Sequence, residues 1–199
     1  MDHRTNNEVA NHDDVPLTFT AVLLAGGESR RMGRDKATIE FEGQPMWKRQ
    51  LEVLRAVGPA KIFVSARTLP PWLPEYAELI EDDAPSRGPL SGLTKALATL
   101  RTTHLIALAA DMPFMTSEQL NVLRELAANS SGVVPFIAER AEPLAAIYPA
   151  EASVDFANAL AGSDFSLQRV IRKLAADEKV RLYPVPAQDE PLYRSVNEP

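Results

Sequence analysis

Short apolar runs recur along the chain, and most of them are followed by a segment with helical periodicity. The run HLIALAA at 104–110 carries no acidic or basic residue after its histidine, and suits a strand buried on both faces of a parallel sheet. Ahead of it, leucines at positions 90, 93, 97 and 100 recur at helical spacing. Alternating strands and helices predict an α/β fold, here a single-domain, three-layer α/β/α arrangement with a mostly parallel central sheet.

The same patterns set the expected boundaries. Strands are expected at 19–24, 61–65, 78–81, 104–110, 132–136, 144–149 and 180–185. Helices are expected at 44–58, from 90 onward, behind a capping-box pattern at 116–119, at 150–160 and at 166–175. Residues 1–18 are polar with little to bury, which predicts a flexible tail and leaves one domain at 19–199.

Composition excludes several classes of function. A chain of 199 residues, 45% of them hydrophobic, can bury the core of one globular domain. The formal net charge of −6 argues against nucleic acid or an anionic membrane as a partner. The absence of cysteine excludes thiol nucleophiles, disulfides and Cys-ligated metals.

Any bound metal should therefore be a hard cation, with Mg²⁺ the natural candidate, held by carboxylates and phosphates. Two of the three histidines, His3 and His12, lie in the tail, and His104 begins an apolar run and is expected to be structural. No apolar run approaches the ~20 residues that cross a bilayer, and the N-terminus has no apolar segment typical of a secretory signal. The expected location is the cytoplasm.

The segment LLAGGESRRMGRDK at 23–36 directly follows the first predicted strand. Its paired glycines, Gly26 and Gly27, allow a sharp turn and a close approach of backbone N–H groups to a ligand. Four cations follow within the seven residues 30–36, and arginine and lysine are the side chains that bind phosphate. The segment is neither a Walker A loop nor a GxGxxG fingerprint. It predicts a polyphosphate site, although a basic surface loop could share its composition.

Other polar residues also follow predicted strands. Three further segments, Ser65 to Arg67, Asp82 with Asp83, and Asp111, each stand at or just beyond a strand end. Ligands of open α/β sheets bind beyond the carboxyl ends of the strands. Asp111 closes an apolar strand, where a carboxylate is costly to bury unless it is paired or bound to metal. The alternatives are a turn-forming aspartate at 111 and a solvated acidic turn at 82. The GPLSG string at 88–92 opens a helix, whose free N–H groups favour anions.

The ordered string LAGGxSxRMGxDK, with ADMPF at 110–114 and GPLSG at 88–92, resembles the signature of the sugar-nucleotide-type nucleotidyltransferases. It is most similar to the molybdenum cofactor guanylyltransferases and their cytidylyltransferase relatives. The resemblance spans about 21–197 and implies a nucleotide-diphospho-sugar transferase-like, Rossmann-like fold.

The resemblance also implies residue roles. Lys36 would stabilise charge on the α-phosphate and the departing pyrophosphate, Arg31 would hold the β- and γ-phosphates, and Asp111 would hold Mg²⁺. Tyr148, in the EPLAAIY string, and Asn197, in the closing VNEP, would border the second substrate. The expected nucleotide-binding positions are Leu24, Ala25, Gly26, Gly27, Arg31, Lys36, Ser65, Asp82, Gly88, Pro89, Leu90 and Gly92.

The implied reaction joins GMP from GTP to a molybdopterin-type cofactor and releases pyrophosphate, with transient contacts to molybdoenzyme maturation proteins. Ser65 stands where guanylyltransferases commonly carry Asn, so a cytidylyltransferase using CTP stays open. A sugar-1-phosphate nucleotidyltransferase is a further alternative, although the chain is short for that group. The last alternative is a non-catalytic GTP- or cofactor-binding carrier, against which Lys36 and Asp111 argue.

Overall fold

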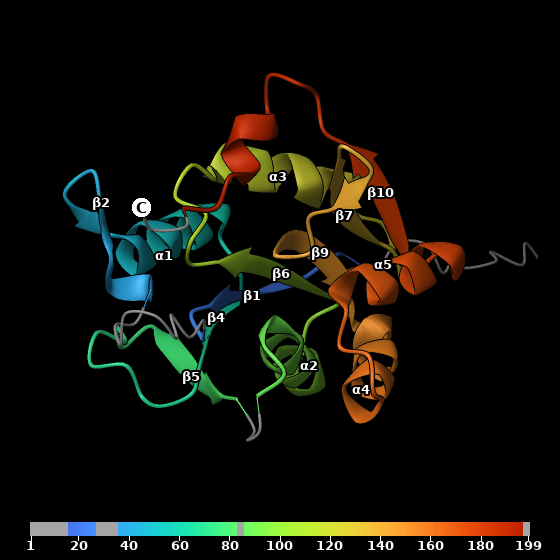
Figure 1. Cartoon of the computed structure of the whole chain (residues 1–199), viewed down its shortest axis with the longest axis horizontal. Coiled ribbons are helices and arrows are strands. Elements are labelled where there is room, and N and C mark those ends of the chain that lie inside the picture. Colours follow the sequence, from blue (N-terminus) through green and yellow to red (C-terminus); the bar gives the residue numbers. More distant parts are fainter. Residues whose placement is uncertain (1–15, 27–35, 83–85, 197–199) are drawn as a thin grey trace, which may run out of the picture.

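The computed structural model describes residues 16–26, 36–82 and 86–196, and an eight-stranded sheet forms its centre (Figure 1). Along the sheet the order is β10-β7-β9-β6-β1-β4-β5, with β8 added beside β7. The strands are β1 (Phe19–Leu24), β4 (Lys61–Ala66), β5 (Ala77–Glu81), β6 (His104–Ala109), β7 (Gly132–Ile137), β8 (Arg140–Ala141), β9 (Ala145–Pro149) and β10 (Val180–Pro184). Only β8 and β9 run antiparallel to their neighbours in this sheet, so the predicted mostly parallel sheet is confirmed.

Helices cover both faces of the sheet (Figure 1). The α-helices are α1 (Met46–Val57), α2 (Pro89–Thr99), α3 (Ser117–Leu126), α4 (Ser153–Ala161) and α5 (Leu167–Ala176). Short 3₁₀ turns are η1 (Lys36–Thr38), η2 (Ala150–Ala152) and η3 (Glu190–Tyr193), and a small hairpin pairs β2 (Glu40–Phe41) with β3 (Gln44–Pro45). None of the helices in the described ranges is long and apolar enough to cross a membrane.

Alternating side chains of the central strands divide the core in two. On β1, Ala21 and Leu23 belong to the cluster that also holds Leu51 of α1 and Leu120 of α3. The intervening Val22 and Leu24 belong to the other cluster, which includes residues of α2, α4 and α5. Successive residues of a strand point to opposite faces, so an all-apolar strand needs helices on both sides. The predicted three-layer arrangement is confirmed.

Two local predictions need correction. Gln44 and Pro45, expected to begin a helix, form β3, and the helix starts at Met46, whose N–H donates to Ile39 O at 2.9 Å. The capping box at 116–119 is only half formed. Thr116 Oγ1 accepts from Gln119 N at 3.2 Å, but the Gln119 side chain donates instead to the Tyr193 hydroxyl at 2.8 Å.

The parallel register brings four strand ends to one edge of the sheet. Leu24 of β1 stands opposite Ser65 on one side and Ala109 on the other, and Ala66 stands opposite Glu81. The segments that follow β1, β4, β5 and β6 therefore leave the sheet side by side. This is the edge at which an open α/β sheet binds its ligands.

Candidate active site

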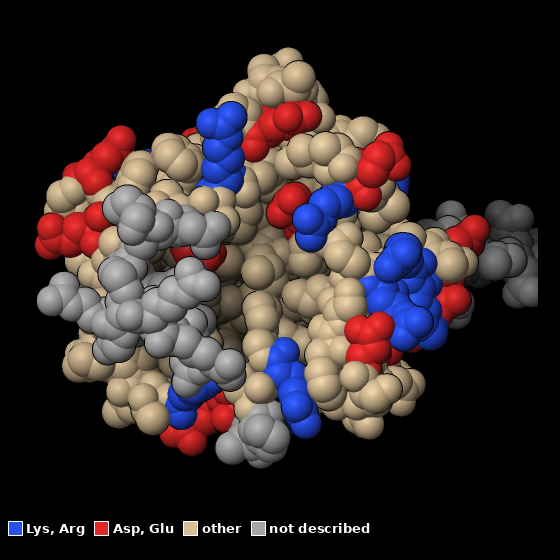
Figure 2. All heavy atoms as spheres, in the orientation of Figure 1, with Lys and Arg blue, Asp and Glu red and all other residues tan. Residues whose placement is uncertain are grey.

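A cavity of about 340 Å³ lies at this carboxyl edge, and the molecule is hollowed near the middle of the face that Figure 2 shows. Its lining comes from segments far apart in the sequence. The lining residues are Leu24, Ala25, Gly26, Ala37, Ser65, Arg67, Asp82, Ser86, Gly88, Pro89, Ala109, Ala110, Asp111 and Leu144. Eight of the residues expected to bind the nucleotide or metal are among them.

Backbone hydrogen bonds continue past the strand ends and fix the first residues of the cavity wall. Ala25 N donates to Ser65 O at 2.9 Å, and Ala110 N donates to Leu24 O at 3.1 Å. On the next strand, Asp82 N donates to Ala66 O at 3.1 Å. The turns into the loops are therefore held in register by the sheet itself.

Ser65 and Asp82 form the polar floor of the cavity. Ser65 Oγ donates to Asp82 Oδ1 at 2.7 Å, and Ser65 is only 2% exposed. Two glycines make room for the pair. A Cβ on Gly92 would lie 2.2 Å from Ser65 Oγ, and a Cβ on Gly26 would lie 2.8 Å from Asp82 Oδ2. Glycine at 26 thus lets a carboxylate approach the backbone, and glycine at 92 lets α2 approach β4.

Asp111 stands two residues beyond the end of β6 and is half-buried at the cavity. Its carbonyl oxygen accepts a 2.8 Å hydrogen bond from Val196 N, so the C-terminal segment returns to this point of the site. Within the described ranges no three His, Asp or Glu residues gather to hold a metal ion. One carboxylate completed by substrate phosphates is nevertheless a usual way to bind Mg²⁺, so the residues present fit that ion.

The start of α2 forms another wall. Gly88 has a φ of 67°, a conformation that favours glycine, and Pro89 occupies the first turn of the helix. Gly88 and Pro89 line the cavity, but Leu90 is 1% exposed and packs into the core under α2. Gly92 lies behind Ser65 and does not line the cavity. Leu90 and Gly92, which were expected to bind the nucleotide, therefore lie behind the residues that line the cavity and pack against them.

Tyr148 lies away from the cavity. It is fully buried on β9 opposite Leu105, near the amino ends of the central parallel strands. Its hydroxyl donates to Pro143 O at 2.7 Å. Burial raises the pKa of this phenol far above its ordinary value. The structure therefore does not bring Tyr148 to the cavity, and Leu144 is the residue of the same EPL string that reaches it.

His104 also lies at the other edge, at the start of β6. It is buried beside Phe19, with ring centroids 5.4 Å apart, and its Nδ1 is 2.9 Å from Thr103 Oγ1. Burial lowers its pKa despite a backbone hydrogen bond to Ser131 that acts the other way. This placement agrees with the structural role predicted for it.

Gly27, Arg31, Asn197 and the side chain of Lys36 lie outside the part of the chain that the structure describes, so their assigned roles stay predictions. The cavity is also lined by Ala37, Ser86 and Leu144, which the sequence does not single out, and by Arg67, which lies in a segment expected at this edge but has no predicted role of its own. Arg67 stands directly after β4 at the carboxyl edge, as expected for the segment from Ser65 to Arg67. Ser86 lies in a loop with no comparable signal.

Residues 21–180 match the MobA-like NTP transferase domain. The chain belongs to this family. The expected resemblance is thereby confirmed, and the protein is a nucleotidyltransferase. A relative from Opitutus terrae, described as a probable molybdenum cofactor guanylyltransferase, is 33% identical over 184 residues, which cover 91% of each chain.

Solved structures agree with the fold of this MobA-like domain. The molybdopterin-guanine dinucleotide biosynthesis protein A of Archaeoglobus fulgidus matches with a TM-score of 0.69 at 22% identity, over 90% of this chain and 93% of that one. The 2-C-methyl-D-erythritol 4-phosphate cytidylyltransferase of Thermus thermophilus matches with a TM-score of 0.62 at 17% identity, over 89% and 92%. At these identities the likeness shows the fold, which is that of nucleotidyltransferases.

Proposed function

We propose that this protein transfers GMP from GTP to the terminal phosphate of a molybdopterin-type cofactor, forming the guanine dinucleotide and releasing pyrophosphate. The observation that carries the proposal is the cavity at which Gly26, Asp82, Asp111 and the start of α2 meet. The proposal is also supported by the Opitutus terrae relative, which is described as a probable molybdenum cofactor guanylyltransferase and is similar over nearly the whole of both chains.

In this reaction a phosphate oxygen of the pterin attacks the α-phosphorus of GTP. A new oxygen–phosphorus bond forms, the bond from the α-phosphorus to the bridging oxygen breaks, and pyrophosphate leaves in line. The nucleophile is already an anion, so no strong general base is needed, and the described cavity lining contains no histidine. Positioning and charge neutralisation supply most of the acceleration in such transfers.

The residues divide this work between them. Asp111 would hold Mg²⁺, and the metal when bound supplies positive charge against the phosphates. Lys36 would place its positive charge beside the α-phosphate, and Arg31 would place its positive charge beside the β- and γ-phosphates. Asp82, held by Ser65, would position the nucleotide above the Gly26 backbone.

The test is pyrophosphate release in the presence of Mg²⁺ and a verified molybdopterin preparation, with GTP and CTP offered in separate reactions. Release with GTP alone supports the proposal. Release with CTP alone keeps the chemistry and overturns the base, which is the outcome that Ser65 leaves open. Release with neither directs attention to sugar 1-phosphates, and GTP binding without turnover on any acceptor would favour the carrier.

A further inference from the structure

Three consecutive carbonyl oxygens, those of Asp111, Met112 and Pro113, each accept a hydrogen bond from a residue far away in the sequence. Asp111 O accepts from Val196 N at 2.8 Å. Met112 O accepts from Gln50 Nε2 at 2.9 Å, and Pro113 O accepts from Arg49 Nε at 2.6 Å. Two neighbouring side chains in the first half of α1 thus hold the turn that follows the candidate metal-binding carboxylate.

Gln50 is poorly explained by stability alone. It is fully buried, and its Oε1 has no hydrogen-bond partner among the residues that the structure describes, an arrangement that costs stability. Met112 O, which accepts the hydrogen bond from Gln50, also accepts one from Met115 N at 3.1 Å. A methionine at position 50 would fill similar space without an unpaired amide oxygen. The amide at position 50 is therefore better explained by its hydrogen bond to Met112 O, which holds the turn after Asp111 in place.

Arg49 is itself fixed from the other side. Its Nη1 lies 3.3 Å from Glu42 Oε2, and its guanidinium lies 5.7 Å from the centroid of the Phe41 ring. Phe41 in turn meets Phe114 edge-on, with centroids 5.1 Å apart. The turn after Asp111 is therefore clamped between α1 and the β2–β3 hairpin.

We infer that Gln50 and Arg49 are positioning residues that set Asp111 for a divalent cation bound together with a nucleoside triphosphate. This inference rests on the proposed function, because it takes Asp111 as the metal ligand. Mg²⁺ demands near-ideal octahedral geometry, so a carboxylate ligand on an unrestrained turn binds it less well. Groups that orient a metal ligand without touching the metal typically change its affinity by about 10- to 100-fold.

The experiment compares Gln50→Met and Arg49→Met with Arg124→Met. Arg124 is a matched control, because its Nη1 donates a 2.6 Å hydrogen bond to a backbone carbonyl of α1, that of Val57, at the end of the helix far from Asp111. Binding of Mn²⁺ in the presence of GTP is measured by electron paramagnetic resonance, since Mn²⁺ favours the same oxygen ligands as Mg²⁺. The Mg²⁺ dependence of pyrophosphate release and thermal unfolding are measured in parallel.

For Gln50→Met and Arg49→Met the Mn²⁺ dissociation constant is expected to rise about tenfold. The Mg²⁺ concentration for half-maximal turnover should rise in step, with turnover largely recovered at saturating Mg²⁺. Gln50→Met should unfold at or above the wild-type temperature, and Arg124→Met should bind Mn²⁺ as the wild type does.

Unchanged Mn²⁺ affinity in both α1 variants overturns the inference, and so does an equal loss in Arg124→Met, which would indicate general loosening. Failure of the wild type to bind Mn²⁺ with GTP also overturns it. If the wild type binds Mn²⁺ with GTP but releases no pyrophosphate, the proposed function fails alone, and the Mn²⁺ titrations still decide the role of Gln50 and Arg49.

Discussion

Ser65 and Asp82 share a 2.7 Å hydrogen bond at the floor of the cavity, and both positions depend on glycines that pack against them. Gly92 leaves room for the Ser65 hydroxyl, and Gly26 leaves room for the second oxygen of Asp82. The pair therefore ties together the ends of β4 and β5, the start of α2 and the loop after β1. A substitution that disturbs any one of these contacts should therefore shift the residues that line the cavity.

Gly92→Ala should destabilise the protein by about 1–3 kcal/mol, the usual cost of overpacking a well-packed interior. The added Cβ would lie 2.2 Å from Ser65 Oγ and 3.0 Å from Leu24 Cδ2. Urea unfolding measures the loss. Gly162→Ala is the control, because its nearest neighbour would lie at an ordinary 3.4 Å. Equal stability of the two variants would contradict this account of the close approach.

Ser65→Ala should weaken nucleotide binding more than it slows turnover. The substitution removes the hydroxyl that donates to Asp82 Oδ1, and a hydrogen bond to a charged group contributes about 1.5–3 kcal/mol. The expected result is about a tenfold rise in KM for the nucleotide with kcat little changed. Steady-state kinetics with varied GTP measures both. A fall in kcat at unchanged KM would show that the pair acts on the transition state instead.

Lys36→Ala should leave the fold intact and slow pyrophosphate release by about 10²- to 10³-fold, as loss of a preorganised charge contact typically does. Circular dichroism checks the fold and single-turnover kinetics the rate. Lys48→Ala, at an exposed position on α1, removes the same charge away from the cavity lining and should behave as wild type. Near-wild-type turnover of the Lys36 variant would remove this lysine from the mechanism.

Much of the fold could be predicted because its strands are apolar on both faces. The runs at β1, β4 and β6 contrast with the amphipathic helices between them, so their order and type follow from periodicity. The meeting of Gly26, Asp82 and Asp111 was predictable for a related reason. Parallel strands end at one edge, and residues just beyond those ends must lie near one another.

Strand direction was not predictable, and it decides the place of Tyr148. The apolar run of β9 is the same whichever way it enters the sheet, but it pairs antiparallel with β6. Its start, next to Leu144, therefore lies at the cavity edge, and Tyr148 lies toward the opposite edge. The hydrogen bond of the Gln119 side chain could not be predicted from local patterns either, because its partner Tyr193 stands 74 residues further along the chain.

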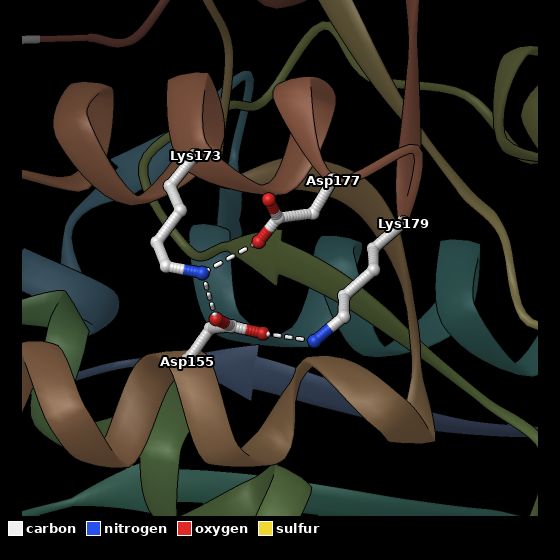
Figure 3. Close-up of polar contacts among 4 residues, drawn as sticks. All are labelled: Asp155, Lys173, Asp177 and Lys179. Carbon is white, nitrogen blue, oxygen red and sulfur yellow. Dashed lines mark hydrogen bonds and ion pairs between the residues drawn. The ribbon is translucent and has the colours of Figure 1, made fainter.

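Asp155→Asn should destabilise the protein at neutral pH and reduce its sensitivity to acid. The carboxylate sits on α4, almost fully buried, and accepts hydrogen bonds from Lys173 Nζ at 2.7 Å and Lys179 Nζ at 2.6 Å, while Lys173 also contacts Asp177 (Figure 3). Burial raises the pKa of Asp155, but the lysine hydrogen bonds outweigh it and hold the pKa below its ordinary value.

A folded-state pKa below the unfolded value gives stability that is present above the unfolded pKa of about 3.9 and is lost as the pH falls through the folded one. Urea unfolding at pH 7 should therefore show a loss of about 2 kcal/mol in Asp155→Asn, and the gap to wild type should narrow below about pH 4. Glu78→Gln is the control, since its 2.8 Å pair with Lys61 is exposed and contributes little. A gap that stays constant from pH 7 to pH 3 would show that packing at position 155, and not its charge, stabilises the contact between α4 and α5.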